Sequence, residues 1–422
     1  MKAIQTDSEN GPPESPTSAV VPLNRQSWIE QFCDYTKDLP SPLVFRRWAA
    51  IGIISAALER KCYTLQLNNV LYPNLFIFLV ARPGVGKSQA LNHALDFARE
   101  TSTKVAPDDA TKPALLDCLS DPSNRQRIHK PDGTMWEYHS MLACAHELGN
   151  LIKEFDLELL TFLSAIWDCP RVFEEHRRGR KDQPLVRIPN PSLTFLAGST
   201  PGYLSSILPD VAWSQGFMAR TILVYSSEVI KPPLFGQRKS DEARQKQLIN
   251  SLEAIGKLEG EFIWSPDAIK AITVWYDNDC PPQPTHHRLL NYATRRPMQA
   301  MKIAMCFAAA RRSMEVALED FTSALEQLTL AESSMPEIFL EMSSNSDIQI
   351  IQELHHYAMT IWLKSEQPLT EARLIWFLMQ KLPTYRHAQL LDSCHQGNVI
   401  TRTLADPHKW VPNVAHQFGA RK

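Results

Sequence analysis

A lysine and a serine at positions 87 and 88 have the residue types and the spacing needed to bind a phosphate chain. They end the segment 81–88, Ala-Arg-Pro-Gly-Val-Gly-Lys-Ser, whose glycines allow backbone N–H groups to curl around phosphates. Lys87 can neutralise the β- and γ-phosphates of a nucleotide, and the Ser88 hydroxyl can ligate Mg²⁺. The alternative is a chance glycine turn. The predicted phosphate-binding residues are Pro83, Gly84, Val85, Gly86, Lys87, Ser88 and Gln89.

Hydrolysis of a nucleotide also needs a carboxylate that orients water, and Glu147 is the best candidate. It follows the apolar run 141–145, as a carboxylate at the end of a strand would. Two residues depart from the usual patterns: Ala81 replaces the first glycine of the loop, and His146 stands where an aspartate is usual. Both departures indicate unusual handling of metal and phosphate. The alternative role for Glu147 is that of an ordinary surface glutamate.

Three further residues could contact the γ-phosphate or the attacking water. Thr200 ends an apolar strand pattern, and its hydroxyl could also cap the following helix. Arg220 directly precedes an apolar strand pattern and could supply positive charge to a transition state, or it could form a structural salt bridge. The pair Arg295 and Arg296 opens a helical pattern, and we prefer Arg296 as the phosphate contact.

The elements that must position these residues alternate between strand and helix. The apolar run 75–80 predicts a buried parallel strand before the loop, with a helix after it. Alternating patterns through 65–230 predict an α/β fold with a doubly wound parallel sheet. Residues 24–64 are predicted to form a helical prefix and 241–340 a helical lid. The Pro- and Ser-rich segment 1–23 is predicted to be a disordered leader.

Residues 346–415 are predicted to form a separate small module. Helical patterns at 348–363, 370–378 and 383–393 precede two short strand patterns around a polar turn. Three helices followed by a hairpin is the layout of a winged helix. Because few cations lie on the third helix, contact with DNA and contact with protein are equally supported.

Composition restricts the class of protein further. The chain has 422 residues, of which 44% are hydrophobic, and 44 Lys and Arg nearly balance 46 Asp and Glu. Any contact with nucleic acid must therefore come from a local patch. Eight cysteines without a C-x-x-C pair argue against a zinc site and a disulfide framework. Without a signal pattern or an apolar run long enough to cross a bilayer, we expect a cytoplasmic protein with no membrane partner.

The order of these motifs resembles that of AAA+ P-loop ATPases. After the phosphate loop come the strand ending in Glu147, the Thr-Pro strand end, the segment Gly-Phe-x-x-Arg-x-x-Leu-Val and a lid arginine. The chain is similar in particular to phage and mobile-element ATPases of the "domain of unknown function" class, which are associated with helicases and primases. Its motif order is similar to that of minichromosome-maintenance helicases. The resemblance covers roughly residues 41–328.

The resemblance implies an ATP hydrolase that uses ATP and Mg²⁺. It implies that Thr200 is a sensor-1 residue, that Arg220 is an arginine finger acting on a neighbouring subunit, and that Arg296 is a sensor-2 arginine. It also implies a homo-oligomer, expected to be a hexamer, whose AAA+ core and helical lid lie between the predicted helical prefix and the predicted C-terminal winged helix.

A basic segment inside the core is the candidate DNA contact. Residues 171–187 read as two short strands around a turn, and helicases of the resembled kind carry a pore hairpin at this place. Repeated around a ring, four cations at its tip would follow a phosphate backbone, most simply that of single-stranded DNA. The alternative is a solvated surface loop. The cations are Arg177, Arg178, Arg180 and Lys181.

Three functions remain open on the sequence. The first is an oligomeric, ATP-driven DNA translocase or helicase that serves phage or mobile-element replication. The second is a replication initiator or helicase loader that binds DNA and assembles on ATP without processive unwinding. The third is a remodelling or defence ATPase that acts on protein.

Overall fold

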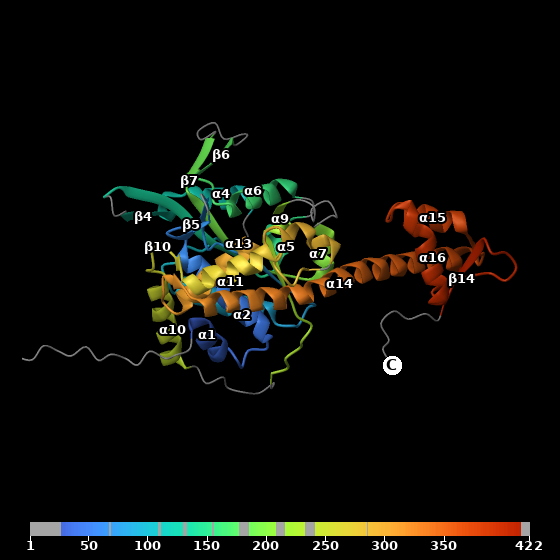
Figure 1. Cartoon of the computed structure of the whole chain (residues 1–422). Helices are drawn as coiled ribbons and strands as arrows, with labels where there is room; N and C mark the ends of the chain where they lie inside the picture. Colours follow the sequence, from blue (N-terminus) through green and yellow to red (C-terminus); the bar gives the residue numbers. More distant parts are fainter. Residues whose placement is uncertain are drawn as a thin grey trace, which may run out of the picture.

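The computed structural model defines a mixed α/β protein in which a central sheet is surrounded by helices (Figure 1). The predicted leader 1–23 and the cations predicted at the tip of the basic hairpin lie outside the residues that it describes. The described residues are 27–66, 69–108, 111–129, 133–153, 156–176, 185–207, 216–232, 241–284 and 286–414.

The central sheet has five strands in the order β4-β5-β8-β3-β9. Four of them are parallel, which agrees with the predicted α/β class. The prediction of a purely parallel sheet is wrong at one edge, where β4 pairs antiparallel with β5. The short connection between these two strands explains the difference, because parallel neighbours need a long crossover. The bounds are β3 Phe76–Val80, β4 Arg125–His129, β5 Met135–Ala145, β8 Pro191–Ser199 and β9 Thr221–Tyr225.

Two helices, α2 (Leu43–Leu58) and α3 (Lys87–Arg99), cover the same face of the sheet. Leu196 and Gly198 of β8 point to one face because side chains alternate along a strand. A Cβ on Gly52 of α2 would lie 2.3 Å from Leu196 Cδ2, and a Cβ on Gly198 would lie 3.3 Å from Leu91 of α3. Because Gly52 has no side chain, α2, most of whose residues are buried, can pack directly against β8.

Aromatic rings of the two central strands pack against one another. Phe76 and Phe78 of β3 both make edge contacts with Phe195 of β8, with ring centroids 5.8 and 5.2 Å apart. Phe217 of α9 lies 6.0 Å from Phe78. The other elements between the strands are α4 Lys112–Ser120, η1 Pro122–Asn124, α5 Leu148–Leu151, α6 Leu157–Trp167, β6 Val172–His176, β7 Leu185–Pro189, α7 Pro201–Ile207 and α9 Gly216–Ala219.

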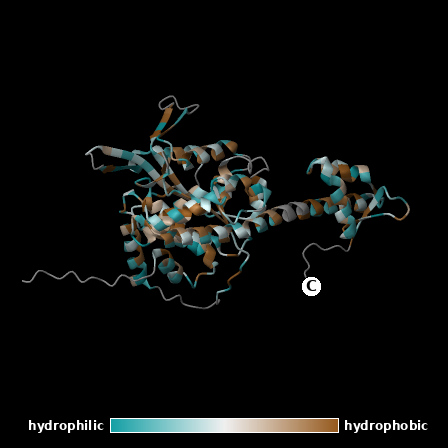
Figure 2. Cartoon of the chain, in the orientation of Figure 1, coloured by the Kyte–Doolittle hydropathy of each residue, from teal (hydrophilic) through white to brown (hydrophobic). Residues whose placement is uncertain are grey.

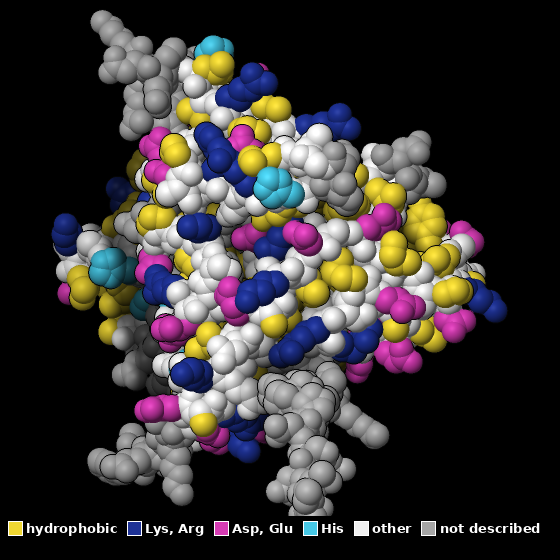
Figure 3. All heavy atoms as spheres, turned by 90° about the vertical axis from the view of Figure 1, so that its left-hand side faces the viewer, with side chains coloured by type: hydrophobic (Ala, Val, Ile, Leu, Met, Phe, Trp, Pro, Cys, Tyr) yellow, Lys and Arg dark blue, Asp and Glu magenta, His cyan; other side chains and the backbone are white. Residues whose placement is uncertain are grey.

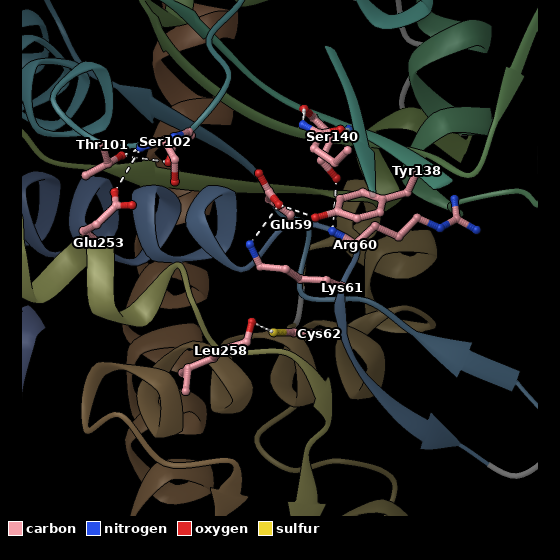
Figure 4. Close-up of polar contacts among 12 residues, drawn as sticks. Glu59, Arg60, Lys61, Cys62, Thr101, Ser102, Tyr138, Ser140, Glu253 and Leu258 are labelled. Atoms are coloured by element: carbon pink, nitrogen blue, oxygen red, sulfur yellow. Dashed lines mark hydrogen bonds and ion pairs between the residues drawn. The ribbon is translucent and has the colours of Figure 1, made fainter. Parts of the chain in front are cut away.

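The end of α2 is tied to β5 by polar contacts (Figure 4). Tyr138 donates its hydroxyl hydrogen to Glu59 Oε2 over 2.6 Å, and Lys61 reaches the same oxygen over 2.9 Å. The backbone N–H of Arg60 donates to Ser140 Oγ over 3.0 Å. The chain then enters β1, whose Cys62 faces the Leu258 carbonyl. These contacts hold the C-terminal end of α2 in place against β5.

Segments at both ends of the sheet region join the same hydrophobic core. One cluster of buried residues runs from Trp28 to Met342. In Figure 2 the helices around the sheet carry hydrophobic and hydrophilic residues side by side, as expected for helices with one buried face. These elements are α1 Trp28–Tyr35, β1 Cys62–Gln66, β2 Asn69–Leu71, α10 Glu242–Ile255, β10 Gly260–Glu261, β11 Ile263–Trp264, α11 Pro266–Asp277, η2 His287–Leu289, α12 Leu290–Ala293, α13 Arg296–Ala310 and β12 Glu315–Val316.

A 48-residue helix, α14 (Leu318–Ser365), leads from this core to a second cluster of buried residues. The expected boundary between 340 and 346 falls inside this helix, whose backbone is helical throughout that range. The predicted order of helices and hairpin follows, and the C-terminal module lies apart from the sheet (Figure 1). Its elements are β13 Leu369–Thr370, α15 Glu371–Met379, η3 Thr384–Arg386, α16 His387–Gln396, β14 Ile400–Arg402 and β15 Lys409–Pro412.

Among the helices of the described ranges, we find none whose length and hydropathy would let it cross a bilayer.

The close approach at Gly52 predicts a cost for a small substitution. Gly52→Ala should lower the free energy of unfolding by about 1–3 kcal/mol through overpacking against Leu196, although alanine favours a helix by about 1 kcal/mol. Denaturation followed by circular dichroism measures this. Gly256→Ala is the control, because its Cβ would meet no atom closer than 3.4 Å. Equal stability of both variants would contradict the packing argument.

Candidate functional site

The carboxyl ends of three parallel strands, β3, β5 and β8, lie side by side, and a cavity lies beyond them. Val80 at the end of β3 pairs with Ser199 at the end of β8, and Ala145 at the end of β5 pairs with Ala197. Ligands of open parallel sheets bind beyond these ends. The cavity has a volume of about 490 Å³. Predicted residues that line it are Pro83, Gly84, Gly86, Lys87, Ser88, Gln89, Glu147 and Thr200.

Two glycines give the loop after β3 its shape. Gly84 and Gly86 have φ angles of +84° and +95°, a region that glycine adopts readily. A Cβ on Gly86 would lie 1.9 Å from the carbonyl oxygen of Pro40, so the segment before α2 lies directly on the loop. α3 then begins at Lys87. Val85 is buried in the core and does not line the cavity.

Ala81 takes the place of the usual first glycine without strain. It is absent from the described residues with positive φ, so its position does not require glycine. Its side chain is buried in the core, and its N–H donates to the Ser199 carbonyl over 3.2 Å. Alanine therefore fits this position, where the backbone continues the pairing of β3 with β8 by one residue.

Lys87 turns back onto its own loop. Its ammonium donates to the carbonyl oxygen of Ala81 over 2.8 Å and to that of Arg82 over 3.2 Å. Burial lowers the pKa of Lys87, and the negative charge of Glu147 opposes this shift. A phosphate in the cavity could replace the two carbonyls as hydrogen-bond acceptor.

Glu147 and His146 follow β5 and line the same cavity. Glu147 is exposed at the start of α5. His146 Nε2 forms a hydrogen bond with Asn92 Oδ1 of α3. Asn92 lies four residues after Ser88, so both share one helix face. A polar pair, His146 and Asn92, thus occupies the region where an aspartate was expected.

Gly198 allows the strand before Thr200 to lie close to β5. A Cβ at Gly198 would lie 2.4 Å from the His146 carbonyl oxygen. Thr200 Oγ1 accepts a hydrogen bond from the Tyr203 N–H over 3.2 Å, which is the capping role proposed as the alternative. Thr200 also lines the cavity, so capping does not remove it from the site.

Arg220 lies at the other end of the strands, beside their amino ends. The next residue, Thr221, pairs with Phe76 at the start of β3, whereas the loop follows the end of β3. The Arg220 guanidinium donates to both carboxylate oxygens of Asp168, over 3.3 and 2.6 Å, and to the Gly216 carbonyl over 2.8 Å. Arg220 therefore forms the structural salt bridge and does not line the cavity of its own chain.

The structure does not bring Arg296 to the cavity, and a sensor-2 contact in the same chain is incompatible with its position. Its side chain is fully buried and forms two hydrogen bonds with Glu332, over 2.7 and 2.8 Å, and one with the Cys280 carbonyl. A buried guanidinium needs a complete set of acceptors, and α14 supplies the carboxylate. Arg295 lies 3.9 Å from the Asp168 carboxylate and so shares this carboxylate with Arg220.

The stem of the predicted basic hairpin is present as β6 and β7, which pair antiparallel from Val172↔Pro189 to His176↔Leu185. Its turn lies outside the described residues, as do the four cations Arg177, Arg178, Arg180 and Lys181.

Several cavity residues escaped the sequence analysis. Pro40, Gly149 and Tyr203 come from separate segments and carry no motif. Asn92 does not line the cavity but contacts His146, and its place one turn after Ser88 was a signal that could have identified it. Across the described ranges, we find no group of three or more His, Cys, Asp or Glu side chains placed to hold a metal ion.

Comparison with known proteins gives no assignment: no protein-family model matches the chain, and a search of curated proteins finds no matching sequence.

Burial of Arg296 predicts a structural role that can be separated from nucleotide binding. Glu332→Ala should lower the free energy of unfolding by about 3–5 kcal/mol, because it leaves a buried cation without its partner. The double variant Arg296→Met, Glu332→Met should regain much of this stability and give the same titration curve with a nucleotide analogue as the parent. Thermal denaturation and titration with a fluorescent ATP analogue measure both effects. Loss of nucleotide affinity in the stable double variant would restore the sensor-2 role.

Proposed function

We propose that this protein is an ATPase of the AAA+ class that uses ATP and Mg²⁺. The observation that carries the proposal is the convergence of Lys87, Ser88, Glu147 and Thr200 on one cavity at the carboxyl edge of the sheet. These residues come from three different strand ends, and each has the chemistry that phosphate transfer to water requires.

Each residue has a defined task in this proposal. The backbone N–H groups of the loop and the start of α3 bind the phosphates, and Lys87 exchanges its carbonyl acceptors for phosphate oxygens. Ser88 would hold Mg²⁺, which neutralises phosphate charge when bound. Glu147 orients the attacking water and accepts its proton, while Thr200 is placed to contact the γ-phosphate or that water.

The proposal includes a homo-oligomer, most simply a hexamer. Arg220 lies at the edge opposite the cavity, so it could act only on the nucleotide of a neighbouring subunit. The guanidinium would have to exchange Asp168 for a phosphate, which an arginine binds well through two parallel hydrogen bonds. A finger of this kind contributes about 10³–10⁵ in rate in related chemistry.

DNA is the proposed substrate of the motor, which makes the protein a translocase or helicase in phage or mobile-element replication. The stem β6–β7 projects from the body of the molecule (Figure 1), and four cations follow in the sequence at its tip. On the face drawn in Figure 3, Lys and Arg side chains are mixed with Asp and Glu. On β4, Arg125 and Arg127 both contact Glu137. This favours the hairpin tip over that face as the contact with single-stranded DNA.

A replication initiator or helicase loader is the second candidate, favoured by the C-terminal module. Its helices and its three-stranded sheet β13-β15-β14 have the order of a winged helix, on which DNA or a protein could bind. A loader would lose DNA binding on mutation of this module while its hydrolysis stays slow. A protein-remodelling or defence ATPase is the third candidate, with hydrolysis that does not respond to DNA.

Two substitutions in the cavity test the proposed ATPase. Lys87→Ala should abolish nucleotide binding, whereas Glu147→Gln should retain it and lower hydrolysis by about 10²–10⁴-fold through loss of the base. Binding of a fluorescent ATP analogue and release of phosphate measure the two steps. Glu100→Gln, at the end of α3, is the surface control. Unchanged hydrolysis in Glu147→Gln would exclude the catalytic role.

Neutralising the hairpin tip tests the DNA motor. With Arg177, Arg178, Arg180 and Lys181 changed to Ala, hydrolysis in the presence of single-stranded DNA should fall to the rate without DNA. The salt dependence of DNA binding should become shallower, because fewer counterions are released. The control neutralises Arg125 and Arg127 on β4 and should keep the stimulation. If DNA does not stimulate the parent protein at all, the translocase function is wrong.

A further inference from the structure

An ion pair connects the phosphate-binding loop to the long helix α14. Arg82, in the loop, contacts Glu341 Oε1 of α14 over 2.8 Å. Tyr225, the last residue of β9, donates its hydroxyl hydrogen to the same oxygen over 2.9 Å. One carboxylate of α14 therefore holds both the phosphate-binding loop and the end of β9, which lies beside the end of β3.

α14 connects the main hydrophobic core, where it makes this contact, to the core of the C-terminal module. Its first part packs on α13, β9 and α7, and α7 begins directly after Thr200. Its last part supplies Leu354 and Ala358 to the core of the C-terminal module. Pro336 lies inside the helix, five residues before Glu341, and a proline removes a backbone hydrogen bond and favours a bend. Beyond it, Ile338, Phe339 and Met342 are still buried in the main core, so the part of α14 that the ion pair can release begins after Met342.

The loop end of the ion pair is sensitive to what Lys87 binds. The Lys87 ammonium donates to the carbonyl oxygens of Ala81 and Arg82. When a phosphate accepts the hydrogen bonds of this ammonium, the Arg82 carbonyl loses its hydrogen bond and the peptide can reorient. The negative phosphates also attract the Arg82 guanidinium away from Glu341.

We propose that the Arg82–Glu341 ion pair is a nucleotide-sensitive contact: nucleotide binding breaks it and frees the part of α14 that holds the C-terminal module. This inference rests on the proposed nucleotide site and adds a route by which that site controls the module. Through it, the C-terminal module binds its partner in a geometry that depends on the nucleotide state.

The exposure of the ion pair suits this role. The Arg82 side chain is 63% exposed and that of Glu341 is 13% exposed. Because solvent reaches the Arg82 guanidinium and the Tyr225 hydroxyl still donates to Glu341 when Arg82 leaves, opening the pair changes an equilibrium by only about two- to fivefold, and a bound nucleotide can displace it. The buried pair of Arg296 and Glu332, by contrast, is too costly to open. Among its ion pairs, α14 thus carries an exchangeable one, Arg82–Glu341, and a permanent one, Arg296–Glu332.

Hydrogen–deuterium exchange of the full-length chain tests the proposal directly. A non-hydrolysable ATP analogue with Mg²⁺ should protect residues 82–99, which contain the loop and α3. In the same sample, exchange in the part of α14 after Met342 should become about two- to fivefold faster.

Two isosteric variants on α14 separate the ion pair from general effects. Glu341→Gln should show the faster exchange without nucleotide and no further change with it. By linkage, it should bind the analogue about two- to fivefold more tightly. Glu337→Gln is the matched control: it removes the same charge near Tyr225, one turn earlier, and should behave as the parent.

The outcomes distinguish the two proposals. Protection of 82–99 without any change in α14 overturns the coupling and leaves the nucleotide site intact. Equal behaviour of the two glutamine variants also overturns it. Absence of protection at 82–99 with every nucleotide overturns the proposed ATPase and the coupling together.

Discussion

The parallel pairing of β3, β8 and β5 is the constraint on which the rest of the molecule depends. Backbone hydrogen bonds fix Val80 beside Ser199, and so the loops after these strands begin at one level. Buried strands of this kind must be covered on both faces. Helices α2 and α3 cover one of them, and the absence of side chains at Gly52 and Gly198 allows the close approach. The cavity is therefore a consequence of strand register and tight packing.

Three arginines show how environment gives one side chain different tasks. The guanidinium of Arg296 is buried against a carboxylate and holds α13 to α14. That of Arg220 is bound to Asp168 at the sheet edge far from the loop. That of Arg82 is largely exposed and can change partner. Burial decides the difference, because removing one partner is costly in the interior and cheap in solvent. The structure thus combines buried ionic contacts that hold its helices together with a more exposed ion pair beside the loop.

Much of the fold and the centre of the candidate site could be predicted from local patterns. The strand before the loop, the helix after it and the placement of Lys87, Ser88, Glu147 and Thr200 depend on short segments with strong periodicity. The antiparallel edge strand β4 and the unbroken helix α14 could not be predicted, since pairing direction and helix length depend on partners distant in the sequence. The same reason explains why Pro40 and Tyr203 were not predicted as cavity residues, because only tertiary packing brings them to the cavity.

The sequence alone determined the chemistry available at the loop: glycines that tolerate positive φ, a lysine and a hydroxyl at the start of a helix, and a glutamate after an apolar strand. These properties are local, because each depends on neighbouring residues. Only the tertiary structure decided which charged residues can reach that loop. It buried Arg296, turned Arg220 toward Asp168 at the opposite edge and joined Arg82 to α14. The physical reason is that a charge takes its partner from whatever the fold places within a few ångströms, and sequence spacing does not contain that information.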